Sequence, residues 1–438
     1  MNVRVTPTHR LAGAVEVPGD KSISHRAALF GALAEGRTEI TGFLEGEDCQ
    51  NTLKAVRALG ASVTRKGPGH YLVDGAGLMG LAEPEDVIDC GNSGTTARLL
   101  LGVLAGQPFW SMLTGDDSLR RRPMGRVAEP LRRMGATVVG RDGGARLPLA
   151  VRGTRPLKAL HFSSPVASAQ VKTALLLAGL WADGPVTVEE PALSRDHTER
   201  MLASFGARLA AAPGRVSITP GGRLTGQPVA VPGDISSAAF FLVAGAMLPE
   251  AQITMKNVGV NPTRTGVLDA LNRMGARITQ EPEGVGGAAE PAADLSVSAA
   301  ALRGTDIGGE LIPRLIDEIP VLAVAACVAQ GVTRIRDAAE LRVKESDRIA
   351  TIAAQLERMG AEISEQPDGL EIRGGRRLRG AVVQSGGDHR MAMALIVAGL
   401  AAEGATVVED TAYIATSFPG FLPALNGLAG GACAVEQP

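Results

Sequence analysis

The chain has 438 residues, of which 45% are hydrophobic, and this is enough for two domains that each bury a core. Only 3% of the residues are aromatic and the formal net charge is -2, so the core must be aliphatic and a general polyanion-binding surface is disfavoured. The four cysteines, Cys49, Cys90, Cys327 and Cys433, lack CxxC spacing and do not cluster with the six histidines, which favours a reduced protein without a metal centre.

The N-terminus predicts a strand rather than a targeting segment. Its first seven residues lack the apolar core of a signal peptide and lead into Pro7. Uncharged apolar runs such as residues 391–402 are shorter than the roughly 18 to 20 residues that span a bilayer, and they predict buried helices. We therefore expect a cytoplasmic protein that does not cross a membrane.

A repeat of two helices and three to four strands recurs six times along the chain. The second helix of each copy ends on a hydrophobic residue followed by glycine and alanine, and consecutive copies lie 69 to 85 residues apart. The closing glycines are Gly60, Gly135, Gly206, Gly275, Gly360 and, in a weaker copy, Gly431. Such regular self-similarity predicts a repeat architecture of the α/β class.

The first copy shows the elements in order. Residues 22–34 predict a helix that Gly36 ends, residues 38–41 predict a strand, and residues 49–59 predict an amphipathic second helix. A hairpin follows, with Ser62-Val63-Thr64 opposite Tyr71-Leu72-Val73. In the later copies we expect first helices to open near Asn92, Ser168, Ser236, Asp317 and Asp388, and second helices near Arg122, Arg195, Thr263, Lys344 and Ser417.

Two similar segments predict where the chain crosses between domains. Val17 to Ser22 and Val231 to Ser236 both carry Pro-Gly-Asp directly before a first helix. The expected boundaries are 20–233 for an N-terminal three-repeat domain, 1–19 plus 234–438 for a C-terminal one, and 17–21 and 231–235 for the two hinge crossings. Two hinge strands suit a lobe that closes over a ligand.

Basic residues recur at the predicted helix starts, where the helix dipole disfavours a cation by about 0.3 to 1 kcal/mol. Free backbone N–H groups together with Lys or Arg bind phosphate and carboxylate, so the recurrence predicts an anion site, although any single member also fits a solvated surface charge. The set comprises Lys21, Arg26, Arg122, Arg195, Lys344, Arg348, His389 and Arg390.

Neutral donors and two acids accompany these cations. The segment from Asn92 to Thr96 combines hydroxyl and amide donors with Gly94, which lets a ligand approach the backbone, although such a segment alone is more often a helix cap. Asp317 and Glu345 lie near cations and can accept or donate protons. The plain alternatives are a helix cap for Asp317 and an ion-pair partner of Arg348 for Glu345.

No familiar cofactor motif has support. Residues 75–80 match GxGxxG, but Glu-Pro-Glu-Asp follows where a long helix is required. The chain contains neither a GxxxxGK[ST] phosphate loop nor an HExxH zinc motif. We therefore expect chemistry without a nucleotide, metal or other cofactor.

Eight ordered motifs across nearly the whole chain resemble one known family, and each begins or precedes a repeat helix. They are PGDKSISHR (18–26), GNSGTTAR (91–98), RRPM (121–124), ASAQVK (167–172), SRDHTE (194–199), DEIP (317–320), RVKESDR (342–348) and DHRMAM (388–393). The family is 5-enolpyruvylshikimate-3-phosphate synthase, also called 3-phosphoshikimate 1-carboxyvinyltransferase.

The resemblance implies the enolpyruvyl transferase fold, an inverted α/β barrel-like arrangement of two domains with three βαβαββ units each, and an active site in the cleft between them. It implies transfer of the enolpyruvyl group of phosphoenolpyruvate to the 5-hydroxyl of shikimate 3-phosphate by addition and elimination, in the shikimate pathway to chorismate and the aromatic amino acids. Both substrates are polyanions, which accounts for clustered cations in a nearly neutral chain. The resemblance further implies a cytoplasmic monomer without cofactor, nucleic-acid partner or membrane partner.

Carried over residue by residue, the resemblance also implies the site. Shikimate 3-phosphate is held by Lys21, Ser22, Arg26, Ser168, Gln170, Arg195, Asp317 and Lys344. Phosphoenolpyruvate is held by Lys21, Gly94, Arg122, Gln170, Arg348 and Arg390. For catalysis, Asp317 is the base for the hydroxyl, Glu345 and Lys21 handle the proton at C3, and His389 orients its neighbours.

Two departures and one retained glycine qualify the resemblance. Thr416 stands where many members carry Lys before the [ST]-[FY]-P segment, so one phosphate contact is missing or replaced. Ala169 stands where other members have a second Ser. Gly94 is retained, and since its replacement by Ala obstructs the herbicide glyphosate in the family, we expect inhibition by glyphosate.

Two other readings stay open at this point. An enolpyruvyl transferase acting on UDP-N-acetylglucosamine shares fold and donor but relies on a loop cysteine, and no cysteine here lies in a matching Gly-rich loop. A non-catalytic DNA clamp of six repeats would spread cations over helix faces, whereas here they gather at helix starts beside Asp317 and Glu345.

Overall fold

The computed structural model describes residues 1–282, 290–430 and 435–436, and these form two compact units. The N-unit comprises Gly19–Val231 together with Glu290, and the C-unit comprises the other described residues. The chain passes from one unit to the other after Pro18 and again after Val231. A hinge movement at these crossings stays a prediction.

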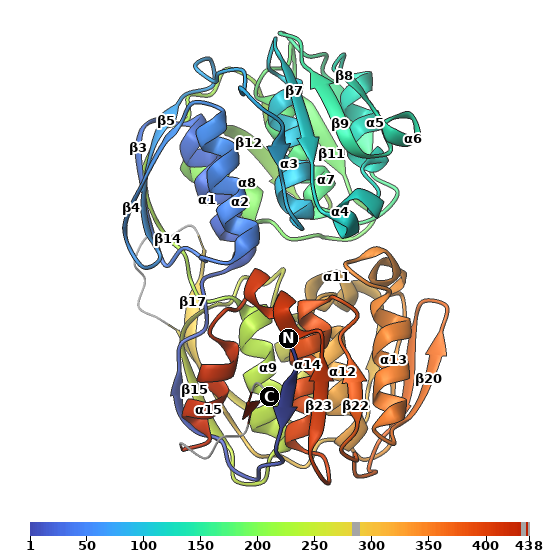
Figure 1. Cartoon of the computed structure of the whole chain (residues 1–438). Helices are drawn as coiled ribbons and strands as arrows, with labels where there is room; N and C mark the ends of the chain where they lie inside the picture. The colour runs from blue at the N-terminus through green and yellow to red at the C-terminus, as the bar shows by residue number, and fades with distance from the viewer. Residues whose placement is uncertain (283–289, 431–434, 437–438) are drawn as a thin grey trace. The chain divides into compact units, whose positions relative to one another are not determined.

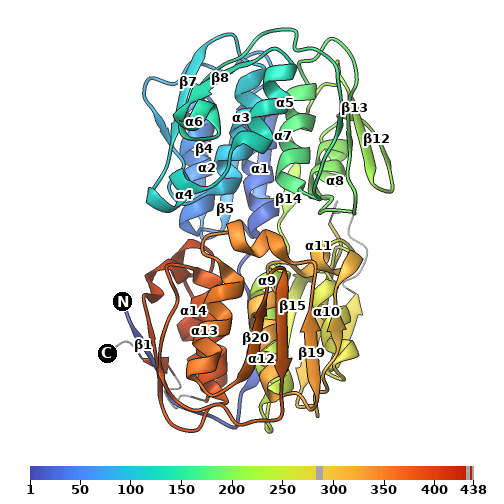
Figure 2. The ribbon, with the colours of Figure 1, turned by 90° about the vertical axis from the view of Figure 1, so that its right-hand side faces the viewer.

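Each unit contains three four-stranded sheets of one pattern, in which a parallel pair is followed by two antiparallel strands. The strand orders are β14-β3-β5-β4, β6-β7-β9-β8 and β10-β11-β13-β12 in the N-unit, and β2-β15-β17-β16, β18-β19-β21-β20 and β22-β23-β1-β24 in the C-unit. The expected α/β fold of six βαβαββ repeats is confirmed (Figures 1 and 2).

The N-unit holds twelve strands and eight helices among its described residues. Its strands are β3 (Glu35–Thr41), β4 (Ser62–Gly67), β5 (His70–Ala76), β6 (Ile88–Asp89), β7 (Trp110–Thr114), β8 (Thr137–Gly140), β9 (Arg146–Arg152), β10 (Leu160–Ser163), β11 (Val186–Glu189), β12 (Arg208–Ala212), β13 (Arg215–Thr219) and β14 (Pro228–Ala230). Its helices are α1 (Lys21–Leu33), α2 (Glu47–Ala58), α3 (Gly94–Ala105), α4 (Asp117–Arg121), α5 (Gly125–Arg133), α6 (Arg141–Gly144), α7 (Ala169–Gly179) and α8 (His197–Ser204). The predicted hairpin is present, with Val63 opposite Val73.

The C-unit repeats the arrangement. Its strands are β1 (Val3–Val5), β2 (Ala12–Val15), β15 (Gln252–Gly259), β16 (Arg277–Pro282), β17 (Ala292–Ser298), β18 (Asp306–Ile307), β19 (Val332–Ile335), β20 (Glu362–Gln366), β21 (Gly369–Arg373), β22 (Val382–Gln384), β23 (Thr406–Glu409) and β24 (Val435–Glu436). Its α-helices are α9 (Ile235–Met247), α10 (Gly266–Arg273), α11 (Ile312–Leu315), α12 (Ile319–Val328), α13 (Arg348–Arg358), α14 (His389–Leu400) and α15 (Phe421–Leu428). Three 3-10 helices accompany them: η1 (Gly309–Leu311), η2 (Ala339–Val343) and η3 (Thr411–Thr416).

Strands from distant parts of the chain complete three of the sheets. β2 runs parallel to β15 in the C-unit, and β14 runs parallel to β3 in the N-unit. The last strand before each crossing therefore belongs to the unit that the chain is about to leave. The N-terminal β1 pairs antiparallel with β23 and takes the third place in the sheet of the sixth repeat. The sequence predicts that the N-terminal strand pairs into the second domain, and β1 does so, but local sequence does not specify the partner strands because they lie far apart in the chain.

The Gly-Ala closings are helix C-caps. Gly60, Gly135, Gly206, Gly275 and Gly360 all have φ between 85° and 105°, where glycine avoids the steric cost of a side chain. In each case the N–H of the next alanine bonds the carbonyl five residues back, as Ala61 does to Val56 at 3.0 Å. In the sixth copy Gly430 takes this left-handed position, and Gly431, which the pattern marks as equivalent, lies outside the described residues.

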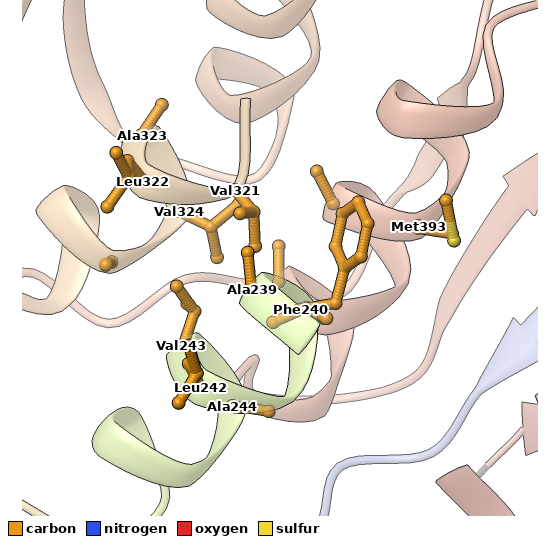
Figure 3. Packing of buried hydrophobic residues seen from close by; sticks show 14 of the residues in the cluster. Ala239, Phe240, Leu242, Val243, Ala244, Val321, Leu322, Ala323, Val324 and Met393 are labelled. Carbon is orange, nitrogen blue, oxygen red and sulfur yellow. The ribbon is translucent and has the colours of Figure 1, made fainter. Parts of the chain in front are cut away.

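The first helix of every repeat is buried on nearly all faces. In the C-unit α9, α12 and α14 pack against one another, and Figure 3 shows Phe240 of α9 near Val321 of α12 and Met393 of α14. In the N-unit α3 and α7 approach so closely that a Cβ on Gly102 would lie 2.2 Å from the Ala174 carbonyl oxygen. Residues 391–402, expected to be buried, lie in and just after α14.

Capping side chains set where five of these first helices begin. Asp20, Ser93, Ser168, Asp234 and Asp388 each accept a hydrogen bond from a backbone N–H of the first turn of α1, α3, α7, α9 and α14. These starts therefore agree with the sequence prediction to within two residues. Several predicted functional residues stand in these first turns: Lys21, Ser22, Gly94, Gln170, His389 and Arg390.

Candidate active site

Lys21 is the first residue of α1, as expected, and it pairs with an acid that sequence reasoning missed. Its Nζ lies 2.5 Å from Asp48 Oδ2 in the first turn of α2. Asp20 caps α1 by accepting from Ile23 N at 2.9 Å, which fixes the position of Lys21 and of Ser22 after it. A cation and a carboxylate thus stand together at two neighbouring helix starts.

Arg26 lies one turn further into α1 and is almost completely buried. Its Nε donates to Thr198 Oγ1 and its Nη2 to Thr173 Oγ1, both at 2.8 Å, and its Nη1 donates to the Ser22 carbonyl. Burial is the largest influence and lowers the pKa of Arg26 to about 10. Its positive charge therefore lies next to the Ser22 carbonyl, and its hydrogen bonds connect α1 to α7 and α8.

A chain of hydroxyl groups leads from α1 to α3. His25 Nδ1 lies 2.7 Å from Thr52 Oγ1, which lies 2.7 Å from Thr96 Oγ1, which donates to Ser93 Oγ at 2.7 Å. Burial first, and then the charges of Lys21 and Arg26, lower the pKa of His25 well below its ordinary value. A neutral imidazole therefore supports the cationic start of α1.

Gly94 faces two guanidinium groups at the start of α3. A Cβ on Gly94 would lie 2.9 Å from Arg98 Nη1 and 3.4 Å from Arg122 Nη1. Arg98 Nη1 donates to Gln170 Oε1 at 2.6 Å, and Gln170 Nε2 donates to Thr95 Oγ1 at 2.9 Å. The structure thus brings Gly94, Arg122 and Gln170 together. It adds Arg98, the last residue of the GNSGTTAR motif, for which the sequence predicts no substrate contact.

Arg122 is held by the segment that precedes α3. Its Nη2 donates to Asn92 Oδ1 at 2.6 Å and its Nη1 to the Asn92 carbonyl at 3.1 Å. The Asn92 side chain donates in turn to Asp116 Oδ2 at 2.7 Å. Asn92, expected to be a donor to a ligand, is therefore also the residue that orients Arg122.

Ser168 and Arg195 lie in loops that join strands to helices in the third repeat. Ser168 caps α7, and its backbone N–H donates to Glu190 Oε1 at 2.9 Å. Arg195 lies two residues before α8, and its charge lies close enough to Arg26 to contribute to the lowered pKa of that residue. The buried Glu190, like Lys172, carries no predicted role.

In the C-unit, Arg348 is the centre of a buried ionic cluster. Its Nε donates to Asp388 Oδ2 at 2.7 Å, its Nη2 to Glu345 Oε2 at 2.6 Å and its Nη1 to Asp317 Oδ1 at 3.1 Å. Burial opposes the charge, but Asp388, Glu345 and Asp317 together raise the pKa of Arg348. The ion pair between Glu345 and Arg348, one of the two readings of Glu345, is present.

Asp317 is surrounded by cations instead of capping a helix. Lys344 Nζ lies 3.5 Å and Arg348 Nη1 3.1 Å from its Oδ1, and Arg390 Nη2 lies 4.0 Å from its Oδ2. The helix cap expected as its plain alternative is wrong, because α12 begins at Ile319 after Glu318 and has no side-chain cap. The five predicted Asp, Glu, Lys and Arg residues of the C-unit therefore meet in one cluster: Asp317, Lys344, Glu345, Arg348 and Arg390.

A second buried polar cluster adjoins Asp317 and was not predicted. Glu318 accepts from the Ser236 hydroxyl, and Arg264 Nη2 lies 3.8 Å from the same carboxylate oxygen. Arg264 also donates to Ser236 Oγ at 2.6 Å and to Asp234 Oδ1 at 3.2 Å. These residues join the start of α9 to the start of α12. In the sequence, the signal for this cluster was Glu318, a second acid directly after Asp317.

His389 and Thr416 stand at the remaining predicted positions. His389 is the buried first residue of α14, beside Asp388 and Arg390. Thr416 is buried at the end of η3 and donates to the Tyr413 carbonyl at 2.7 Å. The threonine therefore satisfies its own hydroxyl locally.

The second helices begin three or four residues later than predicted in four copies and two residues later in the third. Arg122, Arg195 and Lys344 consequently lie in loops before α5, α8 and α13 instead of opening them. Pro123 keeps Arg122 in an extended conformation, with ψ 146°, and Asp347 caps α13 by accepting from Ala350 N. Thr263 and Ser417 likewise precede α10 and α15. Arg348, His389 and Arg390 do stand in first turns.

Three described cysteines are buried thiols. Burial raises the pKa of Cys90 and of Cys327 to about 12, which leaves both protonated at neutral pH. Cys433 lies outside the described residues.

Across the residues that the structure describes, no group of His, Cys, Asp or Glu is arranged to hold a metal ion. In the same part of the chain, all helices fall short of the length and apolarity needed to span a bilayer.

The chain is similar to proteins of one family over nearly its whole length. The family model described as EPSP synthase (3-phosphoshikimate 1-carboxyvinyltransferase) matches residues 5–425. A 3-phosphoshikimate 1-carboxyvinyltransferase of Desulforudis audaxviator is 57% identical over 429 residues, which cover 98% of this chain and 99% of that protein. Another from Synechococcus elongatus is 56% identical over 423 residues, with coverage of 96% and 94%.

Solved structures agree with the sequence comparison. An EPSP synthase from Acinetobacter baumannii aligns over 100% of both chains with a TM-score of 0.87 and 43% identity. The enolpyruvyl transferase NikO from Streptomyces tendae aligns over 98% of this chain and 97% of its own with a TM-score of 0.78, but at 20% identity it indicates a shared fold alone.

Proposed function

The chain belongs to the EPSP synthase (3-phosphoshikimate 1-carboxyvinyltransferase) family, and from this premise we propose which of its residues carry the reaction. It is a transferase that moves the enolpyruvyl group of phosphoenolpyruvate to the 5-hydroxyl of shikimate 3-phosphate and releases phosphate, within the synthesis of aromatic amino acids. The observation that carries the assignment of roles is the position of Asp317 among Lys344, Arg348 and Arg390.

Eight residues bind shikimate 3-phosphate in this proposal: Lys21, Ser22, Arg26, Ser168, Gln170, Arg195, Asp317 and Lys344. The support in the N-unit is that Lys21 and Ser22 open α1 and Ser168 caps α7, so cationic or hydroxyl groups stand at helix N-termini, where the helix dipole favours an anion. Arg26 acts mainly through its positive charge near Ser22, because its guanidinium donates three hydrogen bonds to protein groups. Anionic oxygens are the ligands that such donors favour.

Six residues bind phosphoenolpyruvate: Lys21, Gly94, Arg122, Gln170, Arg348 and Arg390. The absence of a side chain at Gly94 keeps a Cβ out of the space beside the guanidinium groups of Arg98 and Arg122, and in this proposal the small anion binds there. Arg122 is already oriented by Asn92, so little side-chain freedom is lost on binding. These cations also stabilise the phosphate as it leaves.

The chemistry assigns one role to each acid. Asp317 takes the proton from the 5-hydroxyl of shikimate 3-phosphate while the hydroxyl oxygen attacks C2 of phosphoenolpyruvate and C3 gains a proton. Phosphate then leaves as C3 loses a proton, and Glu345 and Lys21 are the groups that handle this proton. His389 orients its neighbours. The hydrogen bonds from Arg348 to both Asp317 and Glu345 support this division, because they hold the two carboxylates at separate nitrogens, Nη1 and Nη2, of one guanidinium group.

A phosphate-release assay with both substrates tests the function. Release is expected only when shikimate 3-phosphate and phosphoenolpyruvate are both present. Replacing shikimate 3-phosphate by UDP-N-acetylglucosamine should abolish it, whereas release with that acceptor would favour the other transferase. DNA retention that falls with salt, in the absence of phosphate release, would favour the clamp reading.

Cellular context completes the proposal. The protein acts in the cytoplasm as a monomer, without cofactor, nucleic acid or membrane partner. Light scattering of the purified protein with and without substrates tests the oligomeric state, because a dimer would give twice the mass of 45.1 kDa.

A further inference from the structure

Glu190 is a buried carboxylate that contacts two loops at once. It follows directly after β11, and its side chain is 3% exposed. Its Oε1 accepts from the backbone N–H of Ser168 at 2.9 Å, and its Oε2 accepts from Ser194 Oγ at 2.8 Å and from Lys172 Nζ at 2.9 Å. Three groups are therefore joined by a single side chain.

The two loops have no regular structure of their own. One runs from β10 to Ser168 at the start of α7, and the other runs from β11 through Ser194 and Arg195 to α8. β10 and β11 are parallel neighbours, with Ser163 opposite Glu189, so Glu190 lies where it can reach the loop that follows the adjacent strand. Its two oxygens set the distance between Ser168 and the residue next to Arg195.

Lys172 balances the charge of this arrangement. The side chain of Lys172, on α7, is 2% exposed, and its Nζ lies 2.9 Å from Glu190 Oε2 and 2.8 Å from Glu199 Oε1 on α8. A buried acid without such a partner is strongly destabilising. Glu199 shares the counterion with Glu190, but it contacts Lys172 from α8 and lies outside both loops. Both glutamates pair with Lys172, but only Glu190 also contacts the two loops. A comparison of variants at the two positions therefore distinguishes loss of the ion pair from loss of the loop contacts.

We propose that Glu190 is a positioning residue for the anionic acceptor substrate. It holds the Ser168 hydroxyl and the Arg195 guanidinium at the separation that the substrate requires, and it does not itself touch the substrate. This inference rests on the proposed assignment of Ser168 and Arg195 to shikimate 3-phosphate. It adds a residue that determines the affinity for the acceptor without entering the chemistry.

The test compares two isosteric variants of the full chain, Glu190→Gln and Glu199→Gln. In E190Q an amide N–H group must face the donors of Ser168, Ser194 or Lys172, so at least one buried hydrogen bond is lost. We expect the dissociation constant for shikimate 3-phosphate, measured by calorimetry without phosphoenolpyruvate, to rise about tenfold or more in E190Q. In E199Q it should change by less than about threefold, because the loops keep their contacts.

Kinetics separate a positioning role from general loss of structure. In E190Q the KM for shikimate 3-phosphate should rise while the KM for phosphoenolpyruvate at saturating acceptor stays within about twofold. A purely structural role would lower the thermal midpoint and the active fraction and leave the KM for shikimate 3-phosphate at the wild-type value. Glu190→Asp keeps the charge but withdraws the oxygens by one methylene, so it should also weaken acceptor binding.

Two results overturn the inference. One is equal acceptor affinity in E190Q and wild type, and the other is an equal loss in E190Q and E199Q, which would make Glu190 only a counterion. If E190Q does not fold, Ser194→Ala removes one of the loop contacts alone and must still weaken acceptor binding. Wild-type protein that fails to bind shikimate 3-phosphate would instead refute the proposed function itself, and the inference with it.

Discussion

Arg348 and Asp388 form a buried ion pair with two hydrogen bonds, from Nε to Oδ2 at 2.7 Å and from Nη2 to Oδ1 at 3.3 Å. Both side chains are at most 1% exposed. Burial alone would raise the pKa of Asp388, but the charge of Arg348 and its hydrogen bond outweigh burial and lower it. Asp388 also caps α14 through Arg390 N, so one carboxylate fixes two of the predicted substrate-binding arginines.

Asp388→Asn should therefore destabilise the protein. Removal of one partner from a buried pair typically costs about 3 to 5 kcal/mol, and the free energy of unfolding in urea should fall by about that amount. Asp347→Asn is the matched control, because Asp347 pairs with Arg342 near the surface and Asn can still cap α13. Equal unfolding free energies for the two variants would contradict a structural role of the Arg348–Asp388 pair.

Asp317→Asn should lose turnover while it keeps most of its substrate affinity. The amide cannot accept the hydroxyl proton, so kcat should fall by at least about a hundredfold. Steady-state kinetics and calorimetry with shikimate 3-phosphate measure the two effects separately. The control is Asp306→Asn, which removes an exposed partner of Arg336 in the same unit. Near-normal turnover in D317N would remove Asp317 from the role of base.

Gly94→Ala should weaken phosphoenolpyruvate binding and glyphosate inhibition together. The added Cβ would lie 2.9 Å from Arg98 Nη1, closer than a Cβ normally approaches, so the guanidinium must shift. We expect the KM for phosphoenolpyruvate to rise about tenfold, which corresponds to about 1.4 kcal/mol. Gly427→Ala, in α15, meets no atom within 4 Å and should leave both constants unchanged. If turnover of the wild-type enzyme is unchanged at high glyphosate and limiting phosphoenolpyruvate, the predicted inhibition by glyphosate is wrong.

His25 should make the protein less stable in mild acid. Its pKa is lower in the folded state than the ordinary value of about 6.5, so the unfolded chain binds the extra proton first as the pH falls. This contribution to stability is complete above about pH 6.5 and declines below it by up to about 1.4 kcal/mol per pH unit. Urea unfolding at pH 7.5 and 5.5 measures the decline.

His25→Gln should lose less stability than wild type between these two pH values. His9→Gln provides the control, because His9 is exposed. If H25Q and wild type show the same decline, His25 does not contribute to the acid sensitivity.

Part of the site could be predicted because it depends on short sequence patterns. The caps Asp20, Ser93 and Asp388 stand directly before first helices, and a cap binds the N–H groups of its own first turn. The positions of Lys21 and Arg390 in first turns follow from the same local rule. The predicted starts of the second helices are less accurate, because the cations do not mark the boundary: Asp347 caps α13, and Pro123 keeps Arg122 extended before α5.

The sequence by itself determined the six repeats, their hairpins and the kinds of side chain at the helix starts, because glycine C-caps, alternating strands and capping residues act over a few residues. Only the tertiary structure decided which partner each charged group meets. Asp48 pairs with Lys21 across 27 residues, Asp388 with Arg348 across 40, and Arg26 with Thr198 across 172. Burial makes an unpaired charge costly, but it does not specify the partner. That choice depends on which helix starts the packed repeats bring together.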